Sequence, residues 1–462
     1  MPKRLLSLAF ILIFIACKNE NKEPNPAVES QKTSTDTVST ESTQTDSSKV
    51  VVANPNLEAD KKLLADFFVK NDKKPQFFTI NNTKDTTIIC VQKTKITIRA
   101  NSFVTSNSKN AVTGKVKISV KEYYSISDIL LGRLSTTSNG KLLETGGMLE
   151  INAFSNNEKC QLKSGKAIEI AFPTKKEKEG MQLFSGSWKN NQINWEVAEN
   201  SVNLNQTFGN VDEAPIFPGG INKFYKLLSS RIHLEGDEEV SGKVYASFVI
   251  DREGNVTNIK IVKGLTKKIN EAVIKAFNNI PKFIPGKVNG IAVNTTYSLP
   301  ITIQSSNDEL DDRPSSTYID KKQRKNYTEE TIKEEEISTI GYYFFSSFKL
   351  GIINCDRFYN LNQNAAINFA VNFENGGETF VSIVFHQMKS IISINTNSKN
   401  AVFKTIPKGK KITIVAIKYI DNKPFIGIKE TTTSAIAENN LAFQPITLQG
   451  IKSEMEKLNR FD

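Results

Sequence analysis

Apolar and polar residues alternate in short runs between residues 59 and 205. Alternation with a period of two places successive side chains on opposite faces of a β-strand. The clearest runs are 96–98, 116–120, 148–151 and 168–172. The turn signals between them are Gly114, Asn139-Gly140, Gly146-Gly147 and Gly165. This spacing predicts a β-sandwich over 59–205, led by a short helix around Leu64, Phe67 and Phe68.

The pattern changes over residues 211–304, where helical and strand periods follow one another. One predicted helix has Ile221, Phe224, Tyr225, Leu228 and Ile232 on one face. A second has Ile269, Ala272, Val273, Ala276 and Phe277 on one face. Alternating runs predict strands over 242–250, 256–262 and 297–303. The order helix, hairpin, helix, strand predicts a small α+β domain with its helices on one face of an antiparallel sheet.

Residues 305–340 are rich in Glu and Lys, so we expect a charged linker there. Strand patterns return in residues 341–462, and the clearest runs are 381–385, 412–417 and 425–428. A short terminal helix is indicated by Leu448, Ile451, Met455 and Leu458. The chain is therefore predicted to be multidomain: a β-sandwich, then a small α+β domain, then a C-terminal β-rich domain.

The amino terminus has the layout of a signal peptide over residues 1–16. Lys3 and Arg4 precede an apolar run of roughly 12 residues, which is shorter than the roughly 20 needed to span a bilayer. Small Ala16 directly before Cys17 resembles the bacterial lipobox. The resemblance implies cleavage before Cys17 and lipidation of that residue. An ordinary secretory signal with an incidental Cys is the alternative.

Residues 17–58 carry few large apolar groups, so we expect a lipidated Cys followed by a disordered, Ser- and Thr-rich tether. The charged stretch after Cys17 looks like that of lipoproteins from the Bacteroidota. No Asp follows Cys17, so the usual signal for retention in the inner membrane is missing. We therefore expect an outer-membrane lipoprotein, facing either the periplasm or the cell surface.

Several phrases in residues 211–304 resemble the C-terminal domain of TonB, in the form found in Bacteroidota. They are Pro215-x-Phe217-Pro-Gly-Gly220, Gly242-Lys-Val-x-x-x-Phe248, Asp251-x-x-Gly254, Pro281-x-Phe283-x-Pro285-Gly286-Lys and Leu299-Pro300-Ile301. Their order is that of the family. The chain departs from it at His233-Leu234, where Tyr-Pro is usual, and at Phe283, where Trp is usual.

This resemblance implies docking by strand addition, in which an extended peptide pairs with the open edge of a sheet. The expected docking edge is the last strand: Tyr297, Ser298, Leu299, Pro300, Ile301, Thr302 and Ile303. Pro300 suits an edge because Pro lacks an N–H. The implied partner is a TonB-dependent outer-membrane transporter or another envelope protein. The alternative is that flanking domains cover this edge.

Composition adds few candidates for chemistry. The formal net charge of +11 falls to +9 without Lys3 and Arg4. The remaining positive charge favours binding to anionic envelope polymers, or it simply reflects a Lys-rich composition. Beyond Cys17 the chain has Cys90, Cys160 and Cys355, and a Cys90–Cys160 disulfide stays open. Two separate His, without C-x-x-C or H-E-x-x-H, argue against a zinc site. We expect no metal, no cofactor and no nucleic-acid partner.

Three short motifs each admit a structural and a functional interpretation. Glu144-Thr-Gly-Gly-Met148 is interpreted as a turn between strands rather than a site. Trp188 and Trp195 flank Asn190-Asn191 in an expected hairpin, where packing across the strands is favoured over sugar binding. Cys355, beside Asp356 and Arg357, is interpreted as a buried structural thiol rather than a reactive one.

Three functions are compatible with these features. The favoured one is a non-enzymatic envelope lipoprotein that docks or scaffolds a protein or peptide partner. The second is a TonB-type energy transducer for transport across the outer membrane, which would need a separate motor subunit. The third is an envelope enzyme acting on glycan or peptide. No Ser/His/Asp set, metal cluster or phosphate loop is evident, so we assign no catalytic residue.

Overall fold

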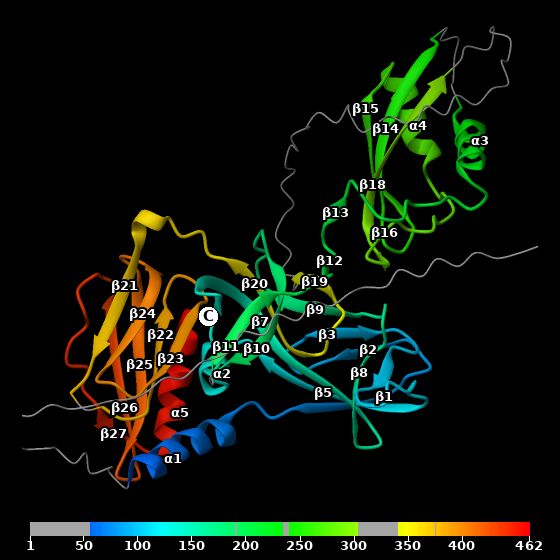
Figure 1. Cartoon of the computed structure of the whole chain (residues 1–462). Helices are drawn as coiled ribbons and strands as arrows, with labels where there is room; N and C mark the ends of the chain where they lie inside the picture. The colour runs from blue at the N-terminus through cyan, green and yellow to red at the C-terminus, as the bar shows by residue number, and fades with distance from the viewer. Residues whose placement is uncertain (1–55, 190–191, 234–239, 304–340, 375) are drawn as a thin grey trace, which may run out of the picture. The chain divides into compact units, whose positions relative to one another are not determined.

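The computed structural model describes residues 56–189, 192–233, 240–303, 341–374 and 376–462, and strands dominate them (Figure 1). Three expected segments lie outside the described residues. They are the signal peptide 1–16, Cys17 with the 17–58 tether up to residue 55, and the 305–340 linker. In the described part of the chain, no helix is both long and apolar enough to cross a membrane.

Two sheets build the first sandwich around one apolar core. The larger sheet contains β1 (Gln76–Asn81), β5 (Lys115–Tyr123), β7 (Lys141–Ser155), β20 (Gly351–Phe358), β10 (Gln182–Lys189) and β11 (Gln192–Val197), in that order. The short strands β4 (Phe103–Thr105), β6 (Thr137–Ser138) and β8 (Glu158–Leu162) pair at its margins. The smaller sheet runs β12 (Val202–Asn203), β19 (Gly341–Ser347), β9 (Ile168–Thr174), β3 (Lys95–Ile98) and β2 (Thr86–Ile89). Inward residues of both sheets, such as Ile118 and Phe172, share the core as their alternation predicted.

Two strands of this sandwich lie beyond the α+β domain in sequence. β19 pairs with β9 and β12, and β20 lies between β7 and β10. Phe345 of β19 is buried against Phe172, with ring centroids 6.4 Å apart. The expected domain boundaries at residues 205 and 341 therefore need correction, because residues 341–358 complete the first sandwich. Hydrogen bonds between strands join distant segments, which local periodicity does not reveal.

The motif at Glu144–Met148 is a bulge within β7, and the expected turn was wrong. Thr145 pairs with Asp356 and Gly147 with Cys355, which leaves Gly146 as the extra residue. Gly147 has a φ of +139°, and a Cβ at this position would lie 2.2 Å from a ring carbon of Tyr124. The glycine thus permits close approach of an aromatic ring rather than reversal of the chain.

The expected hairpin of β10 and β11 is present, but the two Trp side chains do not pack across it. Trp195 lies opposite Gly186, and Trp188 lies opposite Ile193. Trp195 is buried, and its Nε1 donates a hydrogen bond to the Ser135 carbonyl at 2.6 Å. Trp188 is 51% exposed, so the two residues have different roles.

The three described cysteines are buried and free, so Cys90 and Cys160 form no disulfide. Burial raises the pKa of Cys90 to about 12 and raises the pKa of Cys355 well above its usual range. A thiol of this kind is a poor nucleophile. The interpretation of Cys355 as a buried structural thiol is confirmed.

A second group of strands forms the C-terminal sandwich. One sheet runs β23 (Ile391–Thr396), β22 (Thr379–Phe385), β25 (Lys411–Ile420), β26 (Lys423–Thr432) and β27 (Gln444–Pro445). The other pairs β21 (Ala366–Asn372) with β24 (Asn400–Pro407). Between β20 and β21 lies the 3-10 turn η1 (Gln363–Ala365). Phe369, Ile383 and Ile414 lie in the shared core.

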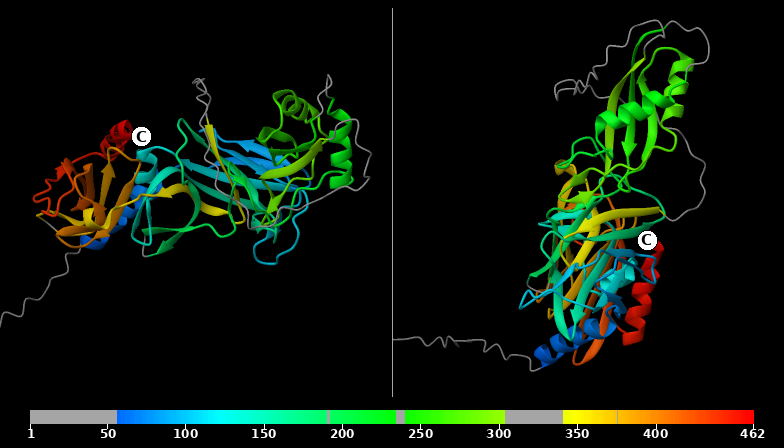
Figure 2. Two further views of the ribbon diagram at one scale, coloured as in Figure 1. Left: turned by 90° about the horizontal axis from the view of Figure 1, so that it is seen from above. Right: turned by 90° about the vertical axis from the view of Figure 1, so that its right-hand side faces the viewer.

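Helices join the two sandwiches. They are α1 (Asn56–Asn71), α2 (Ile126–Leu131) and α5 (Leu448–Lys457), the last continued by η2 (Leu458–Phe461). Figures 1 and 2 show α1 beside the C-terminal strands, where Phe68 contacts Phe380 with ring centroids 4.7 Å apart. α1 and α5 confirm the helices expected at the two ends of the folded chain.

The α+β domain has the predicted order of elements. Its sheet runs β13 (Thr207–Phe208), β18 (Asn294–Ile303), β14 (Gly242–Ile250) and β15 (Val256–Lys263), and its helices are α3 (Ile221–Arg231) and α4 (Lys267–Ala276). A small hairpin pairs β16 (Lys287–Val288) with β17 (Ile291–Ala292). Thr266 caps α4 by accepting a hydrogen bond from the Ile269 N–H. Phe224, Leu228 and Val273 from the helices share one core with the sheet.

Candidate peptide-docking edge

The strand β18 carries the expected docking residues, and one of its sides is only partly covered by the strands that the structure describes. β14 pairs with β18 from Thr295 to Ile303 in an unbroken antiparallel register. On the opposite side, β13 pairs only with Asn294 and Thr295. Among the described residues, no strand therefore lies next to residues 296–303 on that side.

A hydrogen bond in the neighbouring hairpin shows which way the backbone of β18 points. Asp251 N donates to Asn255 O at 2.9 Å, so the backbone of Asp251, directly after β14, faces β15. Backbone groups alternate along a strand, so the even-numbered residues of β14 face β18. Their partners in β18 are the odd-numbered residues. Ser298, Pro300 and Thr302 consequently direct their backbone groups away from β14.

This direction explains why a Pro can stand in the middle of β18. The nitrogen of Pro300 lies on the side away from β14, so its missing N–H removes no bond from the β14–β18 ladder. The N–H groups of Ser298 and Thr302 point to the same side, together with the carbonyls of all three residues. Alternating donors and acceptors along one strand are what an added strand requires.

The side chains of the seven expected site residues divide between the two faces of the sheet. Leu299, Ile301 and Ile303 are buried in the domain core. Tyr297 is half-buried against Phe248, with ring centroids 5.6 Å apart. The odd-numbered residues therefore anchor the strand. The exposed side chains are Ser298 and Thr302, while Pro300 is half-buried.

Three Phe rings hold the sheet and its helices in place around this strand. The ring centroids of Phe217, Phe224 and Phe283 lie 5.0–5.2 Å apart in each pairing. Phe283 is buried, so the departure from the family's Trp is a change of aromatic group within the core. The other departure, His233-Leu234, is only half described: His233 is exposed, and Leu234 lies outside the described residues.

The solvent face of this sheet is basic over β14 and β15, the two strands beyond β18. Cross-strand pairing places Lys243 opposite Thr302, and Lys260 opposite Ser247, which is itself opposite Ser298. Lys263 pairs with Tyr245 in the row between them, its Nζ 5.9 Å from the ring centroid. Residues opposite each other share a face, so three ammonium groups line it. The sequence alone does not reveal this set, because only the strand register brings the lysines together.

Residues 236–302 match the family described as Gram-negative bacterial TonB protein C-terminal. No match was found among curated proteins or among solved structures. The matched segment covers β14, β15, α4 and nearly all of β18. It also includes the Asp251–Gly254 turn, where Gly254 has a φ of +87° and a Cβ would lie 2.0 Å from the Phe283 carbonyl oxygen. Sequence, fold and family match agree that this part of the chain is a TonB C-terminal-like domain.

Proposed function

We propose that the chain is a cell-envelope lipoprotein whose TonB-like domain docks an extended acidic peptide of an envelope partner. The peptide adds as a strand to β18, on the side where Ser298, Pro300 and Thr302 direct their backbone groups. This open side is the observation that carries the proposal. An exposed edge of this kind is a template for an arriving strand.

The chemistry of the neighbouring face favours acidic residues in the peptide. Lys243, Lys260 and Lys263 lie on the face that an added strand extends. Carboxylates on alternate residues of that strand would point to the same face and be attracted by the positive charge of the lysines. A TonB-like domain indicates a cell-envelope protein with an envelope partner. We propose an outer-membrane transporter as the partner and lipidation at Cys17 as the anchor.

Two substitutions at one position test the edge. Thr302→Pro removes the outward N–H, whereas Thr302→Ala keeps it and removes only the side chain. For the chain from Lys18 onward, we expect Thr302→Pro to weaken binding of an acidic peptide from an outer-membrane transporter about tenfold, because one backbone hydrogen bond is lost. Thr302→Ala is expected to bind like the wild type. Fluorescence anisotropy with the labelled peptide measures both.

Thermal melting shows whether each variant keeps its fold. Equal affinity of folded Thr302→Pro and wild-type protein would place any binding elsewhere and overturn the edge. The same peptide with its Asp and Glu changed to Asn and Gln is expected to bind several-fold more weakly. Equal binding of the two peptides would show that the basic face of the sheet does not contribute to docking.

The family match also favours a second function, energy transduction to outer-membrane transporters. The two functions differ in what deletion of the gene does to import. A docking or scaffold protein leaves siderophore and vitamin uptake intact when other TonB proteins are present. Severe loss of uptake, restored by this gene alone, would establish the transducer.

A further inference from the structure

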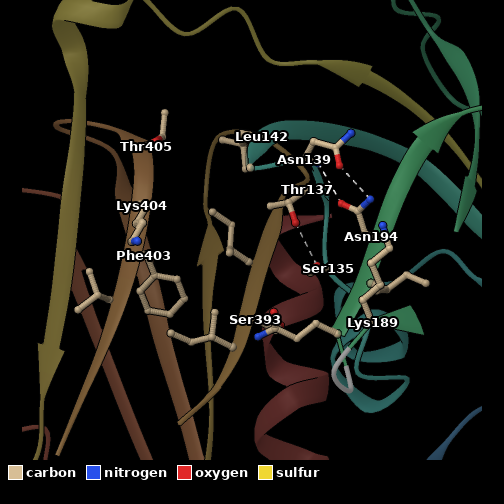
Figure 3. A pocket seen from close by; sticks show the side chains of 16 residues that line it. Ser135, Thr137, Asn139, Leu142, Lys189, Asn194, Ser393, Phe403, Lys404 and Thr405 are labelled. Carbon is tan, nitrogen blue, oxygen red and sulfur yellow. Dashed lines mark hydrogen bonds between the residues drawn. The ribbon is translucent and has the colours of Figure 1, made fainter. Parts of the chain in front are cut away.

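A hollow of about 450 Å³ lies between the first and the C-terminal sandwich (Figure 3). Its walls come from the β6–β7 turn and the β10–β11 hairpin on one side and from β23 and β24 on the other. Figure 3 shows Asn139 and Asn194 facing each other across from Phe403, Lys404 and Thr405. A volume of this size is in the usual range for small-ligand sites.

One wall is held rigidly by a pair of asparagines. The Asn139 N–H donates to Asn194 Oδ1 at 3.0 Å, and Asn194 Nδ2 donates to Asn139 Oδ1 at 3.1 Å. Asn139 and Gly140 have φ values of +48° and +79°, as a two-residue hairpin turn requires. This wall therefore presents amide groups from a fixed turn.

The opposite wall contains a strained residue. Thr405 lines the hollow with a φ of +55°, a conformation that β-branched residues rarely adopt. The β21–β24 register shifts beside it, so the strain is built into a bulge. Strained backbone of this kind is concentrated at functional sites, including those that hold ligands.

The lining combines cations, polar groups and apolar groups. Lys189 and Lys404 both line it, and no Asp or Glu is among the described lining residues. The Glu196 carboxylate lies beside the hollow and accepts a hydrogen bond from Asn194 Nδ2 at 3.4 Å. The contact of Lys189 with Glu196 is loose, at 3.8 Å between exposed side chains. The Ser393 hydroxyl also lines the hollow and bonds to Ser382 Oγ at 2.8 Å. Val402 is 41% exposed on the apolar part. Mixed amide, hydroxyl and hydrocarbon surface suits a sugar, whose ring has a hydroxyl rim and C–H faces, and the two lysines select an acidic one.

We propose that this hollow binds a segment of an acidic oligosaccharide, with Lys189 and Lys404 on its carboxylates. This site is independent of the β18 edge, so the two proposals stand or fall separately.

The test uses the chain from Lys18 onward with tetragalacturonate and its neutral methyl ester as matched probes. Lys189→Gln/Lys404→Gln is expected to weaken binding of the acid at least about tenfold at low salt, because two charge-assisted contacts are lost. Lys61→Gln, on the exposed face of α1, is the matched control and is expected to bind normally.

Calorimetry with both probes decides between the outcomes. Binding of the acid that is lost in the double lysine variant, but kept by Lys61→Gln, supports the site. Absence of binding, equal binding of acid and ester, or equal affinity of the double variant and the wild type would each overturn it. If the double variant melts early, Lys404→Gln alone decides, because Lys404 is exposed.

Discussion

Asp356 carries a fully buried carboxyl group in the first sandwich. Asn354 Nδ2 donates to its Oδ2 at 2.6 Å, whereas Oδ1 has no hydrogen-bond partner among the described residues. Burial raises the pKa of Asp356 to about 8 from a usual value near 3.8. The folded chain therefore binds this proton more tightly than the unfolded chain. Its contribution to stability is complete below about pH 4 and is lost as the pH rises through about 8.

Asp356→Asn is expected to remove this dependence, because an amide cannot ionise. The wild type should lose stability between pH 5 and pH 9, and the variant should lose less. At pH 9 we expect the variant to be more stable than the wild type by at least about 1 kcal/mol. Urea unfolding at both pH values measures the difference. Identical pH profiles of the two proteins would contradict a buried, protonated acid.

At the scale of elements, α1 packs with the C-terminal sandwich rather than with the strands that follow it in sequence. The carboxylate of Asp60 accepts hydrogen bonds from the N–H groups of Asp421 and Asn422, at 3.1 and 2.8 Å. These two residues form the turn between β25 and β26. One buried acid on α1 therefore fixes a hairpin of the C-terminal sheet.

Asp60→Ala is expected to destabilise the chain by about 1–3 kcal/mol, because two N–H groups of the turn lose a charged acceptor. Asp66→Ala on the same helix is the control, since Asp66 is exposed and forms a surface ion pair with Lys62. We expect the control to change the free energy of unfolding by less than about 0.5 kcal/mol. Urea midpoints separate the two, and equal midpoints would show that the turn does not depend on α1.

Local pattern was sufficient for most elements and insufficient for their pairing. The alternating run at 116–120 and the helical pattern of apolar residues at 221–232 identify a strand and a helix. A buried face repeats with the period of its element, so several residues in a row reveal which element it is. The bulge at Gly146 and the placement of β20 depend on strands far away in sequence. For the docking strand, residues 297–303 were predicted, but its open side follows only from the strand order.

At the scale of the whole molecule, the TonB-like domain is an insertion in the first sandwich. The chain leaves after β12 and returns in β19, and these strands pair with Asn203 opposite Phe345. Asn205 adds hydrogen bonds to the Tyr342 carbonyl at 3.0 Å and from the Phe344 N–H at 2.6 Å. The two points of insertion are therefore neighbours.

Replacing residues 206–340 by a short Gly-Ser linker is expected to leave both sandwiches folded, because the linker joins adjacent strands. The shortened chain should melt cooperatively and lose all binding of the docking peptide. Residues 56–205 alone should fail to fold, since β19 and β20 are then missing from the interior of both sheets. Circular dichroism and thermal melting test both. A stable 56–205 fragment would contradict the nested arrangement.

The nesting also sets an order of events when the chain is made. A polypeptide emerges from its amino end, so β20 appears only after the whole TonB-like domain has been synthesised. Contacts in that domain are local and form quickly, whereas pairing of β7 with β20 must wait and spans a long loop. The docking edge is therefore complete before the first sandwich has folded. A chain interrupted before residue 351 would present a complete docking domain on an open, unfinished sandwich.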